Sequence, residues 1–112
     1  MILVSEKEST ITTQPDGAII DYYLAKKASL VFRALNHKLR QQIIKVVHEK
    51  SKVTVTELYV YLRLEQSVAS QHLAILRRCG IVKTKRDGKC VYYMINYDRI
   101  QVIEQCAKDI VN

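Results

Sequence analysis

The sequence has no tryptophan, one phenylalanine, one proline and three glycines, and it lacks any long uncharged apolar run. A membrane-spanning helix needs about 18 apolar residues in succession, so we expect neither a transmembrane segment nor a membrane partner. The first residues carry no basic region followed by an apolar stretch, so no secretory signal is predicted. With 48% hydrophobic and 26% charged residues over 112 positions, the composition indicates one folded, soluble domain.

Cysteine is also scarce: Cys79, Cys90 and Cys106 are an odd number and form no CxxC motif. This pattern supports neither a disulfide framework nor a structural zinc ribbon. A reducing, cytoplasmic location is therefore expected.

Catalytic motifs are missing as well. The chain has no Ser/His/Asp set, phosphate-binding loop or carboxylate pair at a useful spacing, so we expect no enzymatic activity and no cofactor. The three histidines, His37, His48 and His72, are predicted to lie on separate helices, and His72 is interpreted as structural.

The chain does have a concentration of positive charge in its middle. The formal net charge is +7, and residues 26–99 carry 16 basic against 5 acidic side chains. The densest part runs from Arg77 to Lys89, where Asp87 is the single acidic residue. A phosphate backbone is the obvious polyanion for such a cluster, and a solvated basic face is the alternative.

Apolar residues at three- and four-residue steps predict a long helix from Ile19 to Leu35 and a second from about Leu39 to Ser51. The polar side chains of the second helix are expected to face outward: Lys38, Arg40, Gln41, Gln42 and Lys45. Residues 1–17 lack periodicity, which predicts a flexible N-terminal arm before a domain over residues 18–112.

The centre of the chain predicts a helix-turn-helix. Val53-Thr54 is short and β-prone, and Thr54 with Glu57 fits a capping box for a helix over about 55–63. After a tight turn, the next helix runs from about Gln66 to Cys79 and stops at Gly80. Two helices joined by such a short turn form this motif.

A basic β-hairpin and a last helix follow. Ile81–Lys85 and Cys90–Ile95 predict two strands, and Asp87-Gly88 between them is a strong hairpin signal. Asn96 or Asp98 is expected to cap the last helix. The predicted fold class is therefore mainly α with a small β-hairpin: a winged helix-turn-helix in the order α-α-(β)-α-α-β-β-α.

On a helical wheel, the second helix of the motif separates into an apolar and a polar side. Ala69, Leu73 and Leu76 share a narrow arc that should face the core. The opposite, small and polar side comprises Gln66, Ser67, Ser70, Gln71, Ala74, Arg77 and Arg78. Gln pairs with adenine, Ser with several base edges and Ala with the thymine methyl, so this side is predicted to enter a major groove. A solvated helix face is the alternative.

The hairpin is predicted to contact phosphates or a neighbouring minor groove through Lys83, Lys85, Arg86 and Lys89. Such contacts add salt-dependent affinity and read little sequence. The alternative is a solvated hairpin whose lysines prevent edge pairing.

Two stretches carry a family resemblance. Residues 34–44 (ALNHKLRQQII) and 66–82 (QSVASQHLAILRRCGIV) are similar to the second-helix start and the recognition helix of ArsR-type winged-helix regulators. Glu57-Leu58 and Val91-Tyr92-Tyr93 match further family positions, so the resemblance covers roughly residues 19–111. One departure is Glu65, where the family usually has the better helix cap Ser.

The resemblance implies a homodimeric bacterial repressor that binds an inverted repeat in double-stranded DNA. It also implies that the first and last helices form the dimer interface, although their apolar stripes have packing within one chain as the alternative. The stripe residues are Ile20, Leu24, Val31, Ile100, Ile103, Ala107 and Ile110.

Metal sensing, which the resemblance raises, is disfavoured. The family's Cys pair in the third helix corresponds to Tyr59 and Tyr61, which supply no thiolate. Of the site on the last helix, Asp98 and Glu104 remain, but no histidine follows His72, and two carboxylates alone bind zinc poorly.

The predicted function is thus a sequence-specific DNA-binding transcriptional regulator without a named effector. A lone cysteine is usually a small buried apolar residue. A redox-responsive repressor, in which oxidation of Cys79 or Cys90 weakens DNA binding and Cys106 is a further thiol, is one alternative. A protein-interaction winged helix with a vestigial DNA face is another.

Overall fold

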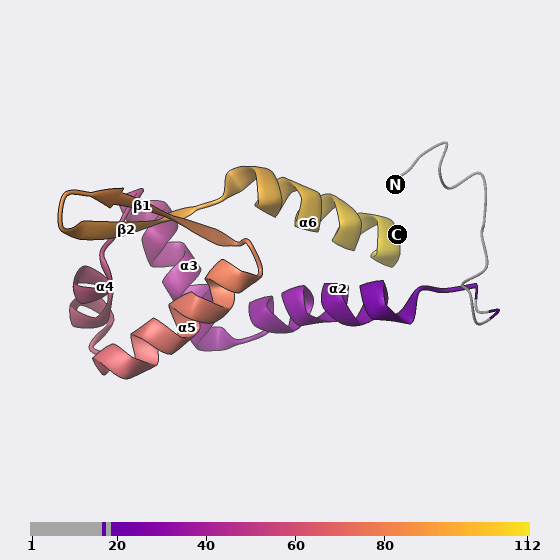
Figure 1. Ribbon diagram of the computed structural model, residues 1–112, viewed down its shortest axis with the longest axis horizontal. Coiled ribbons are helices and arrows are strands. Elements are labelled where there is room, and N and C mark those ends of the chain that lie inside the picture. The colour runs from indigo at the N-terminus through magenta and orange to yellow at the C-terminus, as the bar shows by residue number, and fades with distance from the viewer. Residues whose placement is uncertain (1–16, 18) are drawn as a thin grey trace.

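The computed structural model describes Gly17 and residues 19–112, which form five helices and one two-stranded antiparallel hairpin (Figure 1). The elements are α2 (Tyr22–Leu35), α3 (Lys38–Lys50), α4 (Val55–Leu62), α5 (Gln66–Arg78), β1 (Val82–Asp87), β2 (Cys90–Ile95) and α6 (Tyr97–Val111). This order confirms the predicted fold class. The predicted N-terminal arm lies outside the described residues, apart from Gly17. None of the described helices combines the length and the apolar character needed to cross a membrane.

The first described helix starts later than the prediction. The side chain of Asp21 accepts hydrogen bonds from the backbone nitrogens of Tyr23 and Leu24 at 3.0 and 3.1 Å. Aspartate is a strong N-cap, so α2 begins at Tyr22, and Ile19 and Ile20 precede the helix.

The predicted capping box is present. Thr54 Oγ1 accepts from the Glu57 backbone nitrogen at 3.1 Å, and Glu57 Oε1 accepts from the Thr54 nitrogen at 2.9 Å. The β-prone residue before it forms a single bridge, Val53 to Tyr93, which ties the start of α4 to β2.

The hairpin loop is shifted by one residue from the prediction. The strands pair from Val82–Ile95 to Asp87–Cys90, which leaves Gly88 and Lys89 as the two-residue loop. Gly88 has φ +63°, a conformation in which glycine carries no steric penalty. Arg86 and Asp87 consequently belong to β1 rather than to the tip.

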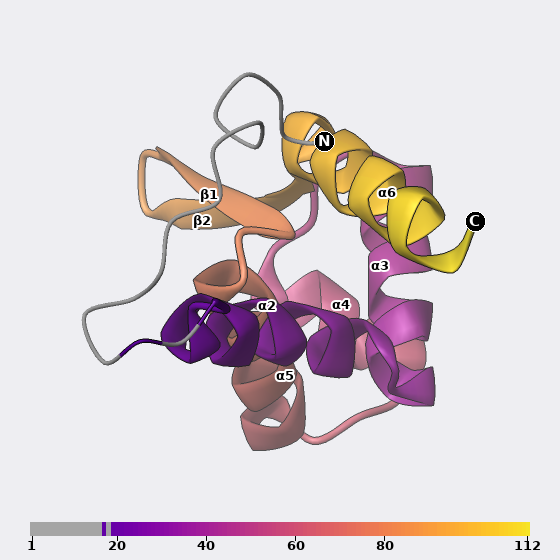
Figure 2. The ribbon, with the colours of Figure 1, turned by 90° about the vertical axis from the view of Figure 1, so that its right-hand side faces the viewer.

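The core lies between α3, α4, α5 and the hairpin. Its buried apolar side chains are Ala34, Ile43, Val46, Val47, Val53, Leu58, Ala69, Leu73, Leu76, Ile81, Val82 and Ile95. The helices α2 and α6 both extend from this core toward the same end of the molecule, as two views agree (Figures 1 and 2). No residue of α6 is fully buried.

Candidate nucleic-acid interface

The helix α5 has the two sides that its sequence predicts. Ala69, Leu73 and Leu76 are fully buried in the core. All seven residues of the opposite side are exposed: Gln66, Ser67, Ser70, Gln71, Ala74, Arg77 and Arg78. We call these seven residues the outward face of α5. The helix therefore rests on the core with one side and presents a small, polar surface with the other.

A tight turn positions α5 against α4. Arg63 ends α4 in the left-handed conformation with φ +57°, and the Leu64 nitrogen donates to the Tyr59 carbonyl at 2.9 Å. Glu65 then occupies the N-cap of α5 and makes no side-chain hydrogen bond to it. The first amides of α5 are consequently not capped by this side chain.

The β1–β2 hairpin, residues 82–95, which we call the wing, lies beside α5. Ile81 and Val82, which join α5 to β1 and begin that strand, are buried in the core and fix the base of the hairpin. The four predicted wing cations are all exposed: Lys83, Lys85, Arg86 and Lys89. Lys89 lies in the loop, and the other three lie along β1. Cations thus follow the strand to its tip instead of clustering at the tip alone.

Arg40 was predicted to face outward, and that prediction is wrong: its side chain is only 8% exposed. Its Nε donates to the Ala34 carbonyl at 2.7 Å, and its Nη2 lies 3.4 Å from the Arg33 carbonyl. Both carbonyls belong to the last turn of α2, where carbonyls run out of intrahelical donors. The Arg33 carbonyl also accepts from the Asn36 nitrogen at 3.2 Å, whereas the Ala34 carbonyl accepts from Arg40. Arg40 is buried because it satisfies the end of α2.

Arg40 also reaches α5. Its Nη1 lies 3.2 Å from Nδ1 of His72, and since arginine can only donate, that nitrogen of His72 accepts. Burial lowers the pKa of His72 below its ordinary value of 6.5, and neighbouring His37 and Arg40 lower it further. His72 is therefore held neutral, and its interpretation as a structural residue agrees with these contacts.

The prediction that the histidines lie on separate helices is wrong for two of them. His37 caps α3 by accepting from the Arg40 nitrogen at 3.4 Å, and His48 lies on the same helix. The rings of His37 and His72 lie 4.9 Å apart. Sequence reasoning missed this cluster because its members are more than 30 residues apart in the chain.

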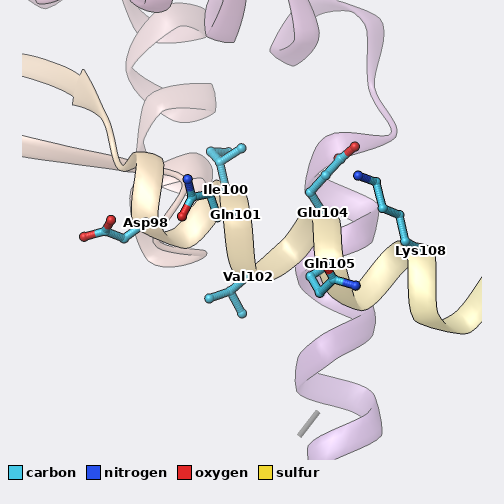
Figure 3. A pocket seen from close by; sticks show the side chains of 7 residues that line it. All are labelled: Asp98, Ile100, Gln101, Val102, Glu104, Gln105 and Lys108. Atoms are coloured by element: carbon cyan, nitrogen blue, oxygen red, sulfur yellow. The ribbon is translucent and has the colours of Figure 1, made fainter. Parts of the chain in front are cut away.

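The helix α6 carries a shallow hollow along one side (Figure 3). Figure 3 shows that Asp98 and Glu104, the two remaining candidate carboxylates, point in different directions from this helix. Among the described residues, no three His, Cys, Asp or Glu side chains lie close enough to hold one metal ion.

The three cysteines are all free thiols. Cys79 is half-buried, and its Sγ lies 3.8 Å from the Leu30 carbonyl. Cys90 and Cys106 are exposed, so the interpretation of a lone cysteine as a buried apolar residue is wrong for these two.

The predicted dimer residues fall into two groups. Ile20, Leu24 and Ile110 are 49%, 61% and 72% exposed. The others are half-buried: Val31, Ile100, Ile103 and Ala107. Both helices thus leave much of their apolar stripe uncovered by the described part of the chain.

A helix-turn-helix whose second helix leads directly into a basic hairpin defines a winged-helix protein. The family model described as "Bacterial regulatory protein, arsR family" matches residues 37–84. An uncharacterized HTH-type transcriptional regulator of Methanocaldococcus jannaschii is 33% identical over 78 residues, which are 70% of this chain and 88% of that protein. The transcriptional activator HlyU of Vibrio cholerae is 34% identical over 77 residues, covering 69% of this chain and 70% of HlyU.

A solved structure agrees with these relatives. The crystal structure of the transcriptional repressor PagR of Bacillus anthracis matches with a TM-score of 0.61 and 26% identity, over 77% of this chain and 99% of that one. This chain belongs to the ArsR family of helix-turn-helix transcriptional regulators. It is accordingly a DNA-binding regulator of transcription and not an enzyme.

Proposed function

We propose that this protein is a homodimeric repressor that binds an inverted-repeat operator in double-stranded DNA. The observation that carries the proposal is the outward face of α5, whose seven side chains are all exposed. Ser67, Ser70 and Ala74 are small, which permits close approach to base edges, and Gln71 offers a bidentate partner for adenine. Arg77 and Arg78, at the C-terminal end, fit the position of a phosphate strand.

The wing supplies affinity in this proposal. Lys83, Lys85, Arg86 and Lys89 are exposed along β1 and its loop. Lysine and arginine that neutralise phosphates release counterions, so their contribution weakens as salt rises. The wing thus holds the protein on the duplex, while α5 discriminates between sequences.

Dimerisation follows from the uncovered apolar stripes of α2 and α6. Leu24 and Ile110 are more than half exposed, and no residue of α6 is fully buried. A chain of this size gains core by burying such stripes against a second copy. Two copies related by a two-fold axis present two recognition helices, which favours an operator with inverted half-sites.

Direct repression without a metal ion is the regulatory mode that we propose. Tyr59 and Tyr61 occupy the positions where the family's thiolate site lies, and Asp98 and Glu104 point apart (Figure 3). A redox response is the second candidate, favoured by the exposed thiol of Cys90 at the start of β2. An oxidised thiol in the wing would alter the surface that faces the phosphates.

Selection of bound sequences from random duplexes tests the proposal. The wild type should enrich an inverted repeat, and Gln71→Ala should relax the preference at one position of each half-site. Gln42→Ala, which removes an exposed glutamine of α3, is the matched control and should select the wild-type repeat. No enrichment by the wild type at low salt would contradict the proposal and would favour the protein-interaction alternative.

A further inference from the structure

A cavity of about 640 Å³ lies between α2 and the C-terminal end of α5, with walls completed by α3 and α6. Its size is in the range of small-molecule sites. Figure 2 shows α2 crossing in front of α5, and the contact from Cys79 Sγ to the Leu30 carbonyl joins the two helices there. The cavity lies at the edge of α5, between its buried side and its outward face.

Five of the lining residues are basic: Lys27, Arg33, Arg40, Arg78 and Arg99. No carboxylate is among the described residues that line the cavity. Like charges that share one cavity repel one another, and an anion bound between them relieves that repulsion. The charge of the lining therefore selects an anionic ligand.

Two of these guanidinium groups are held in place before any ligand arrives. Arg40 donates to the carbonyls of Ala34 and Arg33. Arg99 Nε donates to the Cys79 carbonyl at 3.2 Å, and its guanidinium lies so close to Gly80 that an added Cβ would be 3.0 Å from Nε. A fixed guanidinium loses little freedom when it binds a carboxylate.

Arg99 also has donors to spare. Within the part of the chain that the structure describes, its hydrogen bond to Cys79 uses Nε alone, and neither Nη atom has a hydrogen-bond partner. Two parallel N–H groups of this kind match a carboxylate or phosphate in a bidentate pair. Arg99 is thus the residue on which the anionic group of a ligand would be centred.

The rest of the lining is apolar. Leu30, Ile75 and Val31, the last of which is also one of the predicted dimer residues, contribute hydrocarbon to the walls. An inorganic ion would leave this surface unused, whereas a carboxylate with a short hydrocarbon body would cover it. We infer that the cavity binds a small organic anion of this amphipathic kind.

The site has a direct route to the DNA surface, and this step rests on the proposed function. Arg78 lines the cavity and also belongs to the outward face of α5. An anion held by Arg99 shares this cavity with Arg78 and draws that side chain away from the phosphate backbone, so the ligand and DNA weaken each other's binding by the same factor. The small organic anion is therefore an inducer.

Calorimetric titration of the full chain with octanoate tests the site. Saturable binding by the wild type is expected, with octanamide, which has the same length and no charge, giving none. Arg99→Gln should weaken octanoate binding at least tenfold, and Arg99→Lys, which keeps the charge without the bidentate fork, should weaken it less. Lys45→Gln removes an exposed cation of α3 outside the cavity and should bind octanoate like the wild type. Thermal unfolding followed by circular dichroism checks that each variant is folded.

Three results would overturn the inference. They are no saturable octanoate binding by the wild type, as when a second copy of the chain fills the cavity; equal binding of octanamide; and equal losses in Arg99→Gln and Lys45→Gln. Saturating octanoate should also weaken operator binding of the wild type several-fold and leave that of Arg99→Gln unchanged. A protein that binds operator but not octanoate refutes the anion site alone, and one that binds octanoate but no duplex refutes the proposed function.

Discussion

The helices α5 and α6 are similar in length, 13 and 15 residues, and both are amphipathic, yet they bury their apolar sides differently. In α5, Ala69, Leu73 and Leu76 are completely removed from solvent. In α6, no residue is fully buried, and Ile110 remains 72% exposed.

The same amphipathic pattern therefore leaves a different surface free on each helix. The apolar side of α5 is buried in the core of its own chain, so its polar side is the surface that remains for a ligand. The apolar side of α6 is left open, as is that of α2, so the apolar side itself is the surface that remains. An amphipathic period predicts that one side will be buried, but it does not say against what.

The largest expected effect is the difference in stability lost when an apolar side chain is truncated on α5 and on α6. Leu73→Ala on α5 removes a fully buried side chain and should lower the free energy of unfolding by about 2–5 kcal/mol. Ile110→Ala on α6 should lower it by less than about 1 kcal/mol at a protein concentration where the chain is monomeric. Urea denaturation measures both. Equal losses would show that α6 packs within its own chain.

A charge on the exposed apolar stripe of α2 should weaken dimerisation without unfolding the chain. Leu24→Asp on α2 places a carboxylate in the proposed interface and should weaken dimerisation at least tenfold. Light scattering across a dilution series measures the change, and circular dichroism reports whether the helices persist. Lys38→Asp, at an exposed position of α3, is the charge control. A wild type that is monomeric at every concentration would contradict the proposed interface.

Removing the capping box should have a smaller and strictly local effect. Thr54→Ala deletes the acceptor for the Glu57 nitrogen and should cost about 1 kcal/mol of unfolding free energy. Thr56→Ala, at an exposed position in the first turn of α4, is the control and should change the unfolding free energy little. Chemical denaturation checks the pair. A loss confined to Thr56→Ala would mean that the box does not stabilise α4.

The smallest effect concerns pH. Because the pKa of His72 is lower in the folded chain than its ordinary 6.5, the unfolded chain takes up this proton first as pH falls. The resulting stability is present above about pH 6.5 and is lost as pH decreases toward the lowered pKa of the folded chain. His72→Gln, which keeps an acceptor for Arg40, should flatten the dependence of thermal unfolding on pH between 7.5 and 5.5. The same slope in His72→Gln as in the wild type would refute the role of His72.

Sequence reasoning located α5 because burial against one core leaves a period of three and four residues, and Ala69, Leu73 and Leu76 follow it. It placed the hairpin loop one residue early because Asp-Gly is a local signal, whereas the strand register is set by pairing along both strands. Arg40 was misplaced for a related reason. Its partners are two carbonyls in the last turn of α2 and a nitrogen of His72, and neither kind of partner is visible in the pattern of its own helix.

We propose above that the outward face of α5 discriminates between DNA sequences, while the wing contributes salt-dependent affinity. The most direct test of this claim is the affinity of the wild type, Gln71→Ala and the double variant Arg86→Gln/Lys89→Gln for operator and scrambled duplexes over a range of salt concentrations. Gln71→Ala should lose about 1–3 kcal/mol of discrimination with an unchanged salt dependence. The double variant should keep the discrimination and reduce the slope of log affinity against log salt by about 2. Equal binding of both duplexes by the wild type, or a slope that the double variant leaves unchanged, would contradict the account.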